Sequence, residues 1–399
     1  MTAVPSPDSV ESLRPPQSRR DPAHWIRTNL FDSWSSTLLS VISLAVVLWA
    51  AMFLGQWAFG QAQWEVIPNN LKVIFSGTYP LEQMWRVWFA LGLVMAAFAL
   101  AAGAWGGILM QYVLGLVALM VILSLLPLGG GQLWLGGIAL VTAVITWVSR
   151  NRPSWQLWSL ATWVVVLPLC LVILLGGVGT SLVPVRAEEL SGLLMTLLLA
   201  SVALLVSFPI GVLLALGRAN HALPVIKIFC TILIELVRGV PLTTILFAAW
   251  LLVPLFLEGL TVNLIVRAEV GFILFTAVYV AEDVRGGLQS VSRGQVEAAR
   301  AVGLNPFQIT LLVVLPQALR ASVPALVNAF LTLFKDTSLV FIIGMIDLLA
   351  AGKIVFTNPE WLGTQKEVLF FVGVIYFVFC FAMAYAAKEV EKSLGLGKR

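Results

Sequence analysis

Charged residues are scarce in this chain. Of its 399 residues, 11% are Asp, Glu, Lys or Arg and 60% are hydrophobic. Soluble domains carry about 25% charged residues, so a protein surrounded entirely by water is excluded. The 24 basic residues form no dense stripe, which argues against a nucleic-acid partner. The composition instead predicts a protein whose main solvent is membrane lipid.

The residues that usually bind metals or act as nucleophiles are also few. There are two histidines and three cysteines, without any C-x-x-C spacing: His24, His221, Cys170, Cys230 and Cys380. Such a set provides neither a metal centre nor a nucleophile–base pair. A G-x-x-x-x-G-K-[ST] phosphate loop is missing too, so this chain does not hydrolyse ATP by that chemistry. We expect no catalytic residue, no metal and no cofactor in this chain.

What the chain does contain is a series of long, continuous apolar runs. A bilayer core about 30 Å thick needs about 20 apolar residues in a helix. The predicted spans are residues 37–59, 87–106, 110–127, 132–149, 157–178, 190–217, 229–254, 268–285, 319–345 and 367–387. The sequence therefore predicts an all-α integral membrane protein with about ten transmembrane helices.

Basic residues in the loops predict the orientation of these helices. Residues 1–36 form a polar leader that contains four arginines. Cytoplasmic loops are enriched in Lys and Arg, so we expect both the N terminus and the C terminus in the cytoplasm. Residues 60–86 then form a long external loop, which we expect to lie along the membrane surface. Contact of this loop with an external partner is the alternative.

One stretch interrupts the apolar pattern: residues 297–316, with the sequence EAARAVGLNPFQITLLVVLP. It predicts two helices that are separated by a sharp bend. Gly303 would end the first helix, Asn305 would cap the second, and Pro306 fits the first position of that helix. Pro316 should end or kink the second helix.

The first of these helices is suited to contact with a soluble protein. Ala298 and Ala299 have small side chains, which let another surface approach the backbone, and Glu297 offers that surface a charge. A rigid, bent element at the cytoplasmic boundary can transmit motion. An amphipathic connector, the simpler interpretation, would need neither the Glu-Ala-Ala sequence nor the glycine.

The pattern E-A-A, three residues, G, nine residues, aliphatic, any residue, L-P resembles the coupling loop of permease subunits of bacterial ABC importers. Val313 stands where that pattern usually has Ile. Three segments also resemble the polar amino acid permeases, which serve histidine, glutamine or general L-amino acid uptake: ELVRGVPLTT (235–244), YVAEDVRGGLQSVSRGQVEAA (279–299) and FKDTSLV (334–340). The resemblance covers about residues 188–392. The extra N-terminal half is similar to the general L-amino acid branch in layout only.

The resemblance implies a permease subunit that forms half of a translocation path in the bacterial inner membrane. Its expected partners are ABC ATPase subunits that bind ATP and Mg, a second, paralogous permease, an external amino-acid-binding protein and membrane lipid. The residues expected to couple the path to the ATPase are Glu297, Ala298, Ala299, Gly303, Asn305 and Pro306. The chain would then divide into a leader (1–36), an extra membrane region (37–187), a type I permease core (188–392) with a coupling loop (286–318), and a tail (393–399).

Several polar residues within the core are candidates for the path or its gate. Glu235 and Arg238 lie three residues apart on a helix and should neutralise each other, as a structural or gating pair or as a ligand contact. Pro241 should bend this helix. The other candidates are Thr243, Thr244, Asn328, Thr332, and Lys335 or Asp336, with Glu269 and Asp283 at the two ends of a span. Asn328, Thr332 and Lys335 or Asp336 recur at helical spacing, which is typical of a water-filled path or of an interface with the sister subunit.

Three other functions fit parts of the pattern. An ion-coupled secondary transporter of small polar solutes is the main alternative. It would usually show interrupted helices in corresponding positions of its two halves, whereas here the polar features gather in the second half. A membrane enzyme lacks its catalytic groups, and a scaffold would not need the Glu-Ala-Ala bend.

Overall fold

The computed structural model describes residues 26, 29–125, 131–176, 179, 181–220, 222–256, 262–393 and 395. The two histidines, most of the predicted leader and most of the predicted tail lie outside these residues. The chain divides into two compact units, residues 1–63 and 64–399. The first unit contains α2 (Trp34–Gln56), which continues into a π-helical turn (Trp57–Gln61). This helix is long and apolar enough to cross a membrane.

The second unit is built from helices throughout its described residues. In its N-terminal part they are α3 (Val66–Ser76), α4 (Met84–Trp105), α5 (Gly107–Ser124), α6 (Gln132–Ser149) and α7 (Gln156–Leu175). The core follows with α8 (Leu193–Ala219), α9 (Pro224–Arg238), α10 (Leu242–Phe256), α11 (Leu264–Ser290), α12 (Arg293–Ala301), α13 (Pro306–Gln308), α14 (Leu315–Asp336), α15 (Leu348–Thr357) and α16 (Gln365–Ser393). The described residues thus confirm the predicted all-α class.

Nine helices in the described residues are long and apolar enough to cross a membrane. Eight of the ten predicted spans match them directly, and the ninth predicted span, residues 319–345, overlaps the C-terminal part of a longer helix, Pro306–Ile343. The seventh predicted span, residues 229–254, is not one helix. It is the pair α9 and α10, whose axes meet at 109°. Gly239 and Pro241 lie between them; Pro has no backbone N–H to donate, and Gly weakens a helix, so the break falls there.

The directions of the neighbouring helices agree with a single span for the bent pair. α8 and α11 run in the same direction, since Leu190 and Ile265 line one small cavity near their starts, while Arg218 contacts Glu282 near their ends. The chain between them therefore returns from one end of the unit to the other. With this pair counted as one span, the described residues contain ten candidate spans, in agreement with the predicted number of about ten.

Glycines allow the core helices to approach closely. A Cβ atom on Gly211 of α8 would lie 2.5 Å from Val280 of α11, and one on Gly287 of α11 would lie 2.3 Å from the Ala318 carbonyl oxygen of α14. Both distances are shorter than any real contact, so these crossings require glycine. α11 is consequently enclosed between α8 and α14, and it carries several of the polar residues considered below.

The N-terminal helices pack on this core. One buried cluster joins Ala90 of α4 and Val166 of α7 to Leu199 of α8 and Phe272 of α11. The segment predicted as a long external loop, residues 60–86, is largely helical. It contains α3, whose apolar face packs against α8, α15 and α16, because its buried residues recur at helical spacing.

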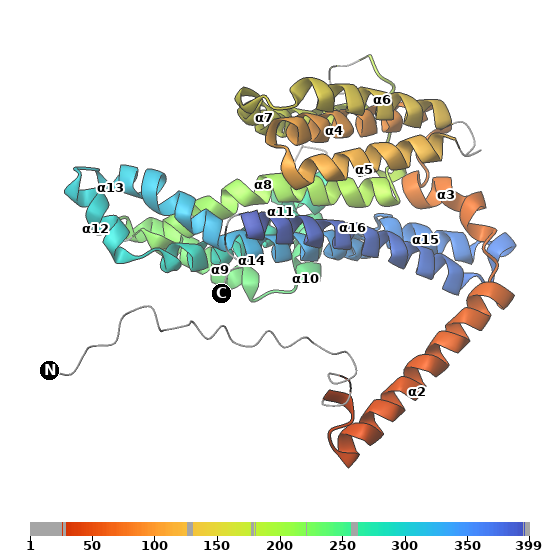
Figure 1. Ribbon diagram of the computed structural model, residues 1–399. Coiled ribbons are helices and arrows are strands. Elements are labelled where there is room, and N and C mark those ends of the chain that lie inside the picture. Colours follow the sequence, from red (N-terminus) through yellow and green to blue (C-terminus); the bar gives the residue numbers. More distant parts are fainter. Residues whose placement is uncertain are drawn as a thin grey trace. The chain divides into compact units, whose positions relative to one another are not determined.

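Figure 1 shows the second unit with α12 and α13 at one end, here called the coupling end, and with α3 and α15 at the opposite end, the far end. Chain direction agrees with this view. α11 runs from the far end to the coupling end and passes directly into α12. The bent segment is therefore placed at the tip of the permease core.

Candidate coupling segment and charge cluster

The bend at the coupling end has the geometry that its sequence predicts. Gly303 has φ +86°, the left-handed conformation that favours glycine. Its N–H donates to the Arg300 carbonyl at 2.9 Å, and the Leu304 N–H donates to the Ala299 carbonyl at 3.2 Å. These two bonds form a Schellman motif, which satisfies the last carbonyls of α12. The helix end is consequently fixed rather than frayed.

The second helix begins with a reciprocal capping box. The Gln308 N–H donates to Asn305 Oδ1 at 2.9 Å, and the Asn305 N–H donates to Gln308 Oε1 at 3.0 Å. Pro306 occupies the first turn, where its missing N–H costs nothing. The predicted roles of Gly303, Asn305 and Pro306 in shaping the bend are confirmed.

Pro316 does not end the second helix. Between α13 and α14 the chain forms a π-helical segment, Ile309–Val314, in which the Leu315 N–H donates to the Thr310 carbonyl five residues earlier. Widening the helix by one residue per turn gives room for a proline that has no N–H. The prediction that Pro316 stops or kinks the helix is corrected to a π-helical passage into α14.

The exposed face of the bend differs from the expected one. Glu297 and Ala298 are exposed, but Ala299 is buried within the chain itself, so only the first alanine is open to a partner. Val302 and Phe307 are 76% and 73% exposed, on either side of Gly303. These two apolar side chains were not identified from the sequence, because only the charged and the small residues of the bend were considered. Both apolar side chains are therefore open at the bend, together with Glu297 and Ala298.

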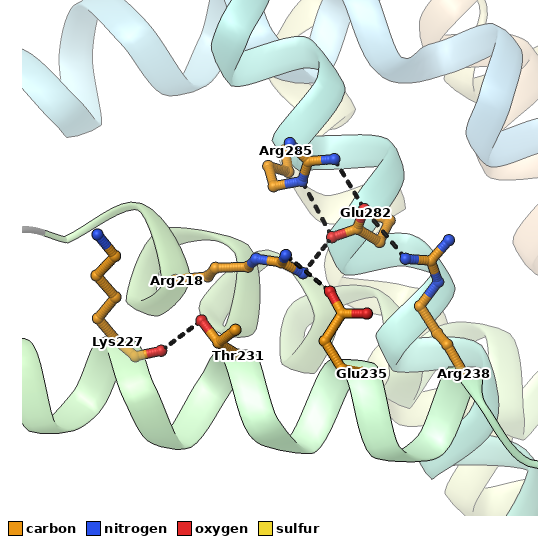
Figure 2. A network of polar contacts seen from close by, with 7 residues as sticks. All are labelled: Arg218, Lys227, Thr231, Glu235, Arg238, Glu282 and Arg285. Atoms are coloured by element: carbon orange, nitrogen blue, oxygen red, sulfur yellow. Dashed lines mark hydrogen bonds and ion pairs between the residues drawn. The ribbon is translucent and has the colours of Figure 1, made fainter.

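A cluster of ion pairs joins α8, α9 and α11 near the coupling end (Figure 2). Arg218 donates to Glu235 at 2.8 Å and to Glu282 at 2.7 Å. Arg238 lies 3.3 Å from Glu282, and Arg285 lies 2.9 Å from it. One carboxylate, that of Glu282, thus receives three guanidinium groups from three helices.

The partners of Glu235 and Arg238 are not the predicted ones. Their i,i+3 spacing allows contact, but Arg218 and Glu282, which are distant in sequence, lie closer to them. Arg238 also stacks over the ring of Tyr279, with 5.8 Å between the guanidinium carbon and the ring centroid. Local spacing finds neighbours on one helix and has no information on helices that pack beside it.

A groove of about 270 Å³ lies between α11 and α14 beside this cluster. Its lining residues are Glu282, Asp283, Gly286, Gly287, Ser290, Ala321, Ser322 and Ala325. The small residues open the groove, and Glu282, Asp283, Ser290 and Ser322 supply its polar groups. Asp283, which the sequence placed at the inner end of a span, thus lies at the coupling end beside Glu282.

The predicted stripe on α14 is open to the outside of the single chain. Asn328, Thr332 and Lys335 are exposed, whereas Asp336 is half-buried. They follow Ala321 and Ala325 of the groove at intervals of three or four residues, so they share its face of the helix. The stripe therefore continues the α14 side of the groove, and Glu235 is not among the residues that line this groove. In α10, Thr243 is half-buried and Thr244 is exposed, directly after the break.

Glu269 of α11 is buried, at 7% exposure, and neither carboxylate oxygen has a hydrogen-bond partner among the described residues. It stands near the start of α11 and so at the far end of that helix. Glu282 and Asp283 lie on the same helix, but nearer its other end. The described residues include no group of three or more His, Cys, Asp or Glu that would hold a metal ion.

Comparison with known proteins identifies the family. The model of the family described as "Binding-protein-dependent transport system inner membrane component" matches residues 207–395. The inner membrane amino-acid ABC transporter permease protein YhdY of Escherichia coli (strain K12) is 35% identical over 390 residues, which cover 94% of this chain and 93% of that protein. The chain belongs to this permease family. The match of nearly full length includes the N-terminal half.

Two other relatives show how the chain is built. The glutamate/glutamine/aspartate/asparagine transport system permease protein BztC of Rhodobacter capsulatus is 32% identical, over 96% of this chain and 97% of that protein. The glutamate/aspartate import permease protein GltK of Escherichia coli O157:H7 is 38% identical over 205 residues, which are 50% of this chain and 90% of that protein. Some family members thus have a counterpart for only half of this chain.

Membership fixes the general function. The chain is a multi-pass inner-membrane permease subunit of an ATP-driven importer of the bacterial type. It is not itself an enzyme, because the ATPase of such a system is a separate subunit, and the family needs no cofactor in the permease. An ATPase and a binding protein are its implied partners. The ion-coupled secondary transporter receives no support.

Proposed function

We propose that this chain forms half of the translocation path of an importer for polar L-amino acids. Its relatives support this class of solute, since they are named as permeases for amino acids or for glutamate, glutamine, aspartate and asparagine. The second half of the path would be a paralogous permease. A cytoplasmic ATPase that binds ATP and Mg would drive the pair, and an external amino-acid-binding protein would deliver the solute.

The bend at the coupling end would dock on the ATPase. Glu297 supplies a charge, Ala298 keeps the backbone accessible while Ala299 packs inside the chain, and the shape depends on Gly303 and on the Asn305–Pro306 start of the next helix. We add the exposed side chains of Val302 and Phe307 to this surface. The Schellman motif and capping box make the bend rigid, so a push on α12 would move α11 and α14 instead of being absorbed.

The path would run along the face shared by the α11–α14 groove and the α14 stripe. A charged amino acid cannot cross hydrocarbon without a large cost in free energy, so it needs polar walls. Asn328, Thr332 and Lys335 provide such walls, and Asp336 lies at their edge. Glu235 and Arg238 belong to the charge cluster at the coupling end and would act as a gate. Thr243 and Thr244, after the break, are the remaining candidates for the path.

The proposed orientation places the coupling end in the cytoplasm, together with both chain termini. We keep the proposed division into a leader (1–36), an extra membrane region (37–187), a permease core (188–392) and a tail (393–399). Ten crossings and the excess of basic residues in alternate loops support this orientation.

The observation that carries the coupling proposal is the left-handed Gly303, and a matched pair of glycines tests it. A Cβ atom would meet nothing within 4 Å at either Gly303 or Gly294, but only Gly303 has a positive φ. Gly303→Ala should therefore strain the bend by roughly 1–2 kcal/mol, whereas Gly294→Ala should not. In the complete reconstituted complex we expect Gly303→Ala to lower solute-stimulated ATP hydrolysis and uptake, and Gly303→Asp to abolish both. Unchanged uptake in both Gly303 variants would refute the coupling role.

A further inference from the structure

α3, which lies in the extra N-terminal region, is packed into the permease core. Its buried residues Val66, Ile67 and Ile74 share one apolar cluster with Leu348 and Val355 of α15. The same cluster includes residues of α8 and α16. The extra region thus supplies one wall of a cluster whose other walls belong to the core.

Hydrogen bonds tie the end of α3 to the start of α15. The Thr78 N–H donates to Ser191 Oγ at 3.0 Å, and the Gly192 N–H donates to the Ile346 carbonyl at 2.9 Å. The Leu348 N–H donates to Thr196 Oγ1 at 3.0 Å. Three segments that are distant in sequence therefore meet at one point, and α3 and α15 are held to it from both sides.

The backbone at this point leaves no room for a side chain. Gly77 and Gly192 have φ values of +56° and +70°. A Cβ atom on Gly192 would lie 2.5 Å from the Ile74 carbonyl oxygen, and one on Gly77 would lie 1.8 Å from Ser191 Oγ. This close fit fixes α3 relative to the first turn of α8.

α3 and α15 lie at the far end of the second unit (Figure 1). If the coupling end faces the ATPase, the far end faces the side from which the binding protein comes. On their outer faces α3 exposes Asn69 and Lys72, and α15 exposes Lys353 and Thr357. A lysine is the single charged residue within each of the two helices.

We propose that α3 and α15 form one composite surface that receives the external solute-binding protein, so that the extra region supplies part of the receptor. This proposal rests on the proposed function. The partner is a folded, soluble protein with carboxylates opposite Lys72 and Lys353. Glu65, which precedes α3, and Glu360, which follows α15, are exposed as well. Lipid headgroups are the competing occupant, and they would leave α3 without any contact to a protein.

Site-specific cross-linking in the complete complex, reconstituted in nanodiscs with its ATPase and binding protein, tests this surface. A benzophenone amino acid is placed at Asn69, at Thr357, or at the exposed Gln295 of α12. We expect the first two positions to capture the binding protein and Gln295 to capture the ATPase. Capture at Thr357 together with lipid adducts alone at Asn69 would overturn the composite surface and leave the proposed function intact. If Gln295 captures no ATPase, the proposed function itself is wrong.

A charge reversal provides a second measurement. Lys72→Glu should raise the concentration of binding protein that gives half-maximal stimulation of ATP hydrolysis by about fivefold, because a like charge would meet the partner's carboxylates. Stimulation at saturating binding protein should be unchanged. The control is Lys388→Glu, near the C-terminal end of α16. This variant should leave the half-maximal concentration unchanged. No shift with Lys72→Glu at low salt would overturn the charge complementarity.

Discussion

The guanidinium of Arg218, in the last turn of α8, donates to Glu282 Oε1 of α11 at 2.7 Å. Arg238 and Arg285 contact the other carboxylate oxygen of the same residue. Glu282 is only 14% exposed, so its charge is balanced by these arginines more than by water. α8, α9 and α11 are therefore joined at one carboxylate, eight residues before α11 ends and passes into the coupling segment.

Replacing this carboxylate should destabilise the permease more than replacing its exposed neighbour. Glu282→Gln removes the charge that three arginines share, and we expect a loss of about 1.5–3 kcal/mol. Glu235→Gln is the matched control, because the Glu235 side chain is 57% exposed and has one arginine partner. The apparent melting temperature of the detergent-solubilised complex measures both. Equal shifts for the two variants would contradict a central role for Glu282.

Two adjacent glycines in α11 should respond differently to the same substitution. A Cβ atom on Gly287 would lie 2.2 Å from Ser322 Oγ and 2.3 Å from the Ala318 carbonyl oxygen, whereas one on Gly286 would meet nothing within 4 Å. Gly287→Ala must push α14 away and should cost about 1–3 kcal/mol. Gly286→Ala should be neutral or slightly stabilising. Thermal unfolding of both variants decides this, and a stable Gly287→Ala protein would show that the helix crossing is looser than the structure indicates.

The features that the sequence predicts well are those that depend on neighbours along the chain. Apolar runs predict the spans because the side chains of a membrane helix that face lipid must be apolar. Gly303, Asn305 and Pro306 shape the bend through bonds that reach only a few residues. These predictions are confirmed for that reason.

The features that the sequence did not predict depend on contacts between distant segments. The pairing of Arg218 with Glu282 joins positions 64 residues apart, and spacing along one helix has no information on it. The packing of α3 on α15 is of the same kind. The sequence predicts a bend at Pro241, but the proline alone does not predict the angle of 109° between α9 and α10.

Asp347 should be needed to hold α15 in place. It is fully buried, caps the helix by accepting from the Leu349 and Ala350 N–H groups, and accepts from the Tyr376 hydroxyl. Asp347→Ala removes all three bonds and should cost about 1–2 kcal/mol through the lost cap. Tyr376→Phe removes a single bond and should cost less. If α15 supports the binding-protein surface, Asp347→Ala should also weaken binding-protein stimulation of ATP hydrolysis, a result that a purely local role for the cap would not produce.

The orientation of the permease gives the last prediction. The candidate span Pro306–Ile343 separates the coupling end from the far end, so we expect the two ends on opposite sides of the membrane. After replacement of the three native cysteines, a single cysteine is introduced at Gln295 or at Thr357, both of which are exposed. A membrane-impermeant maleimide should label Thr357→Cys in intact spheroplasts and Gln295→Cys only in inverted vesicles. Labelling of both from one side would mean that α14, the candidate span between the two positions, does not cross the bilayer. Labelling of Gln295→Cys from outside would place the coupling segment away from any cytoplasmic ATPase, and the proposed mechanism would then be wrong.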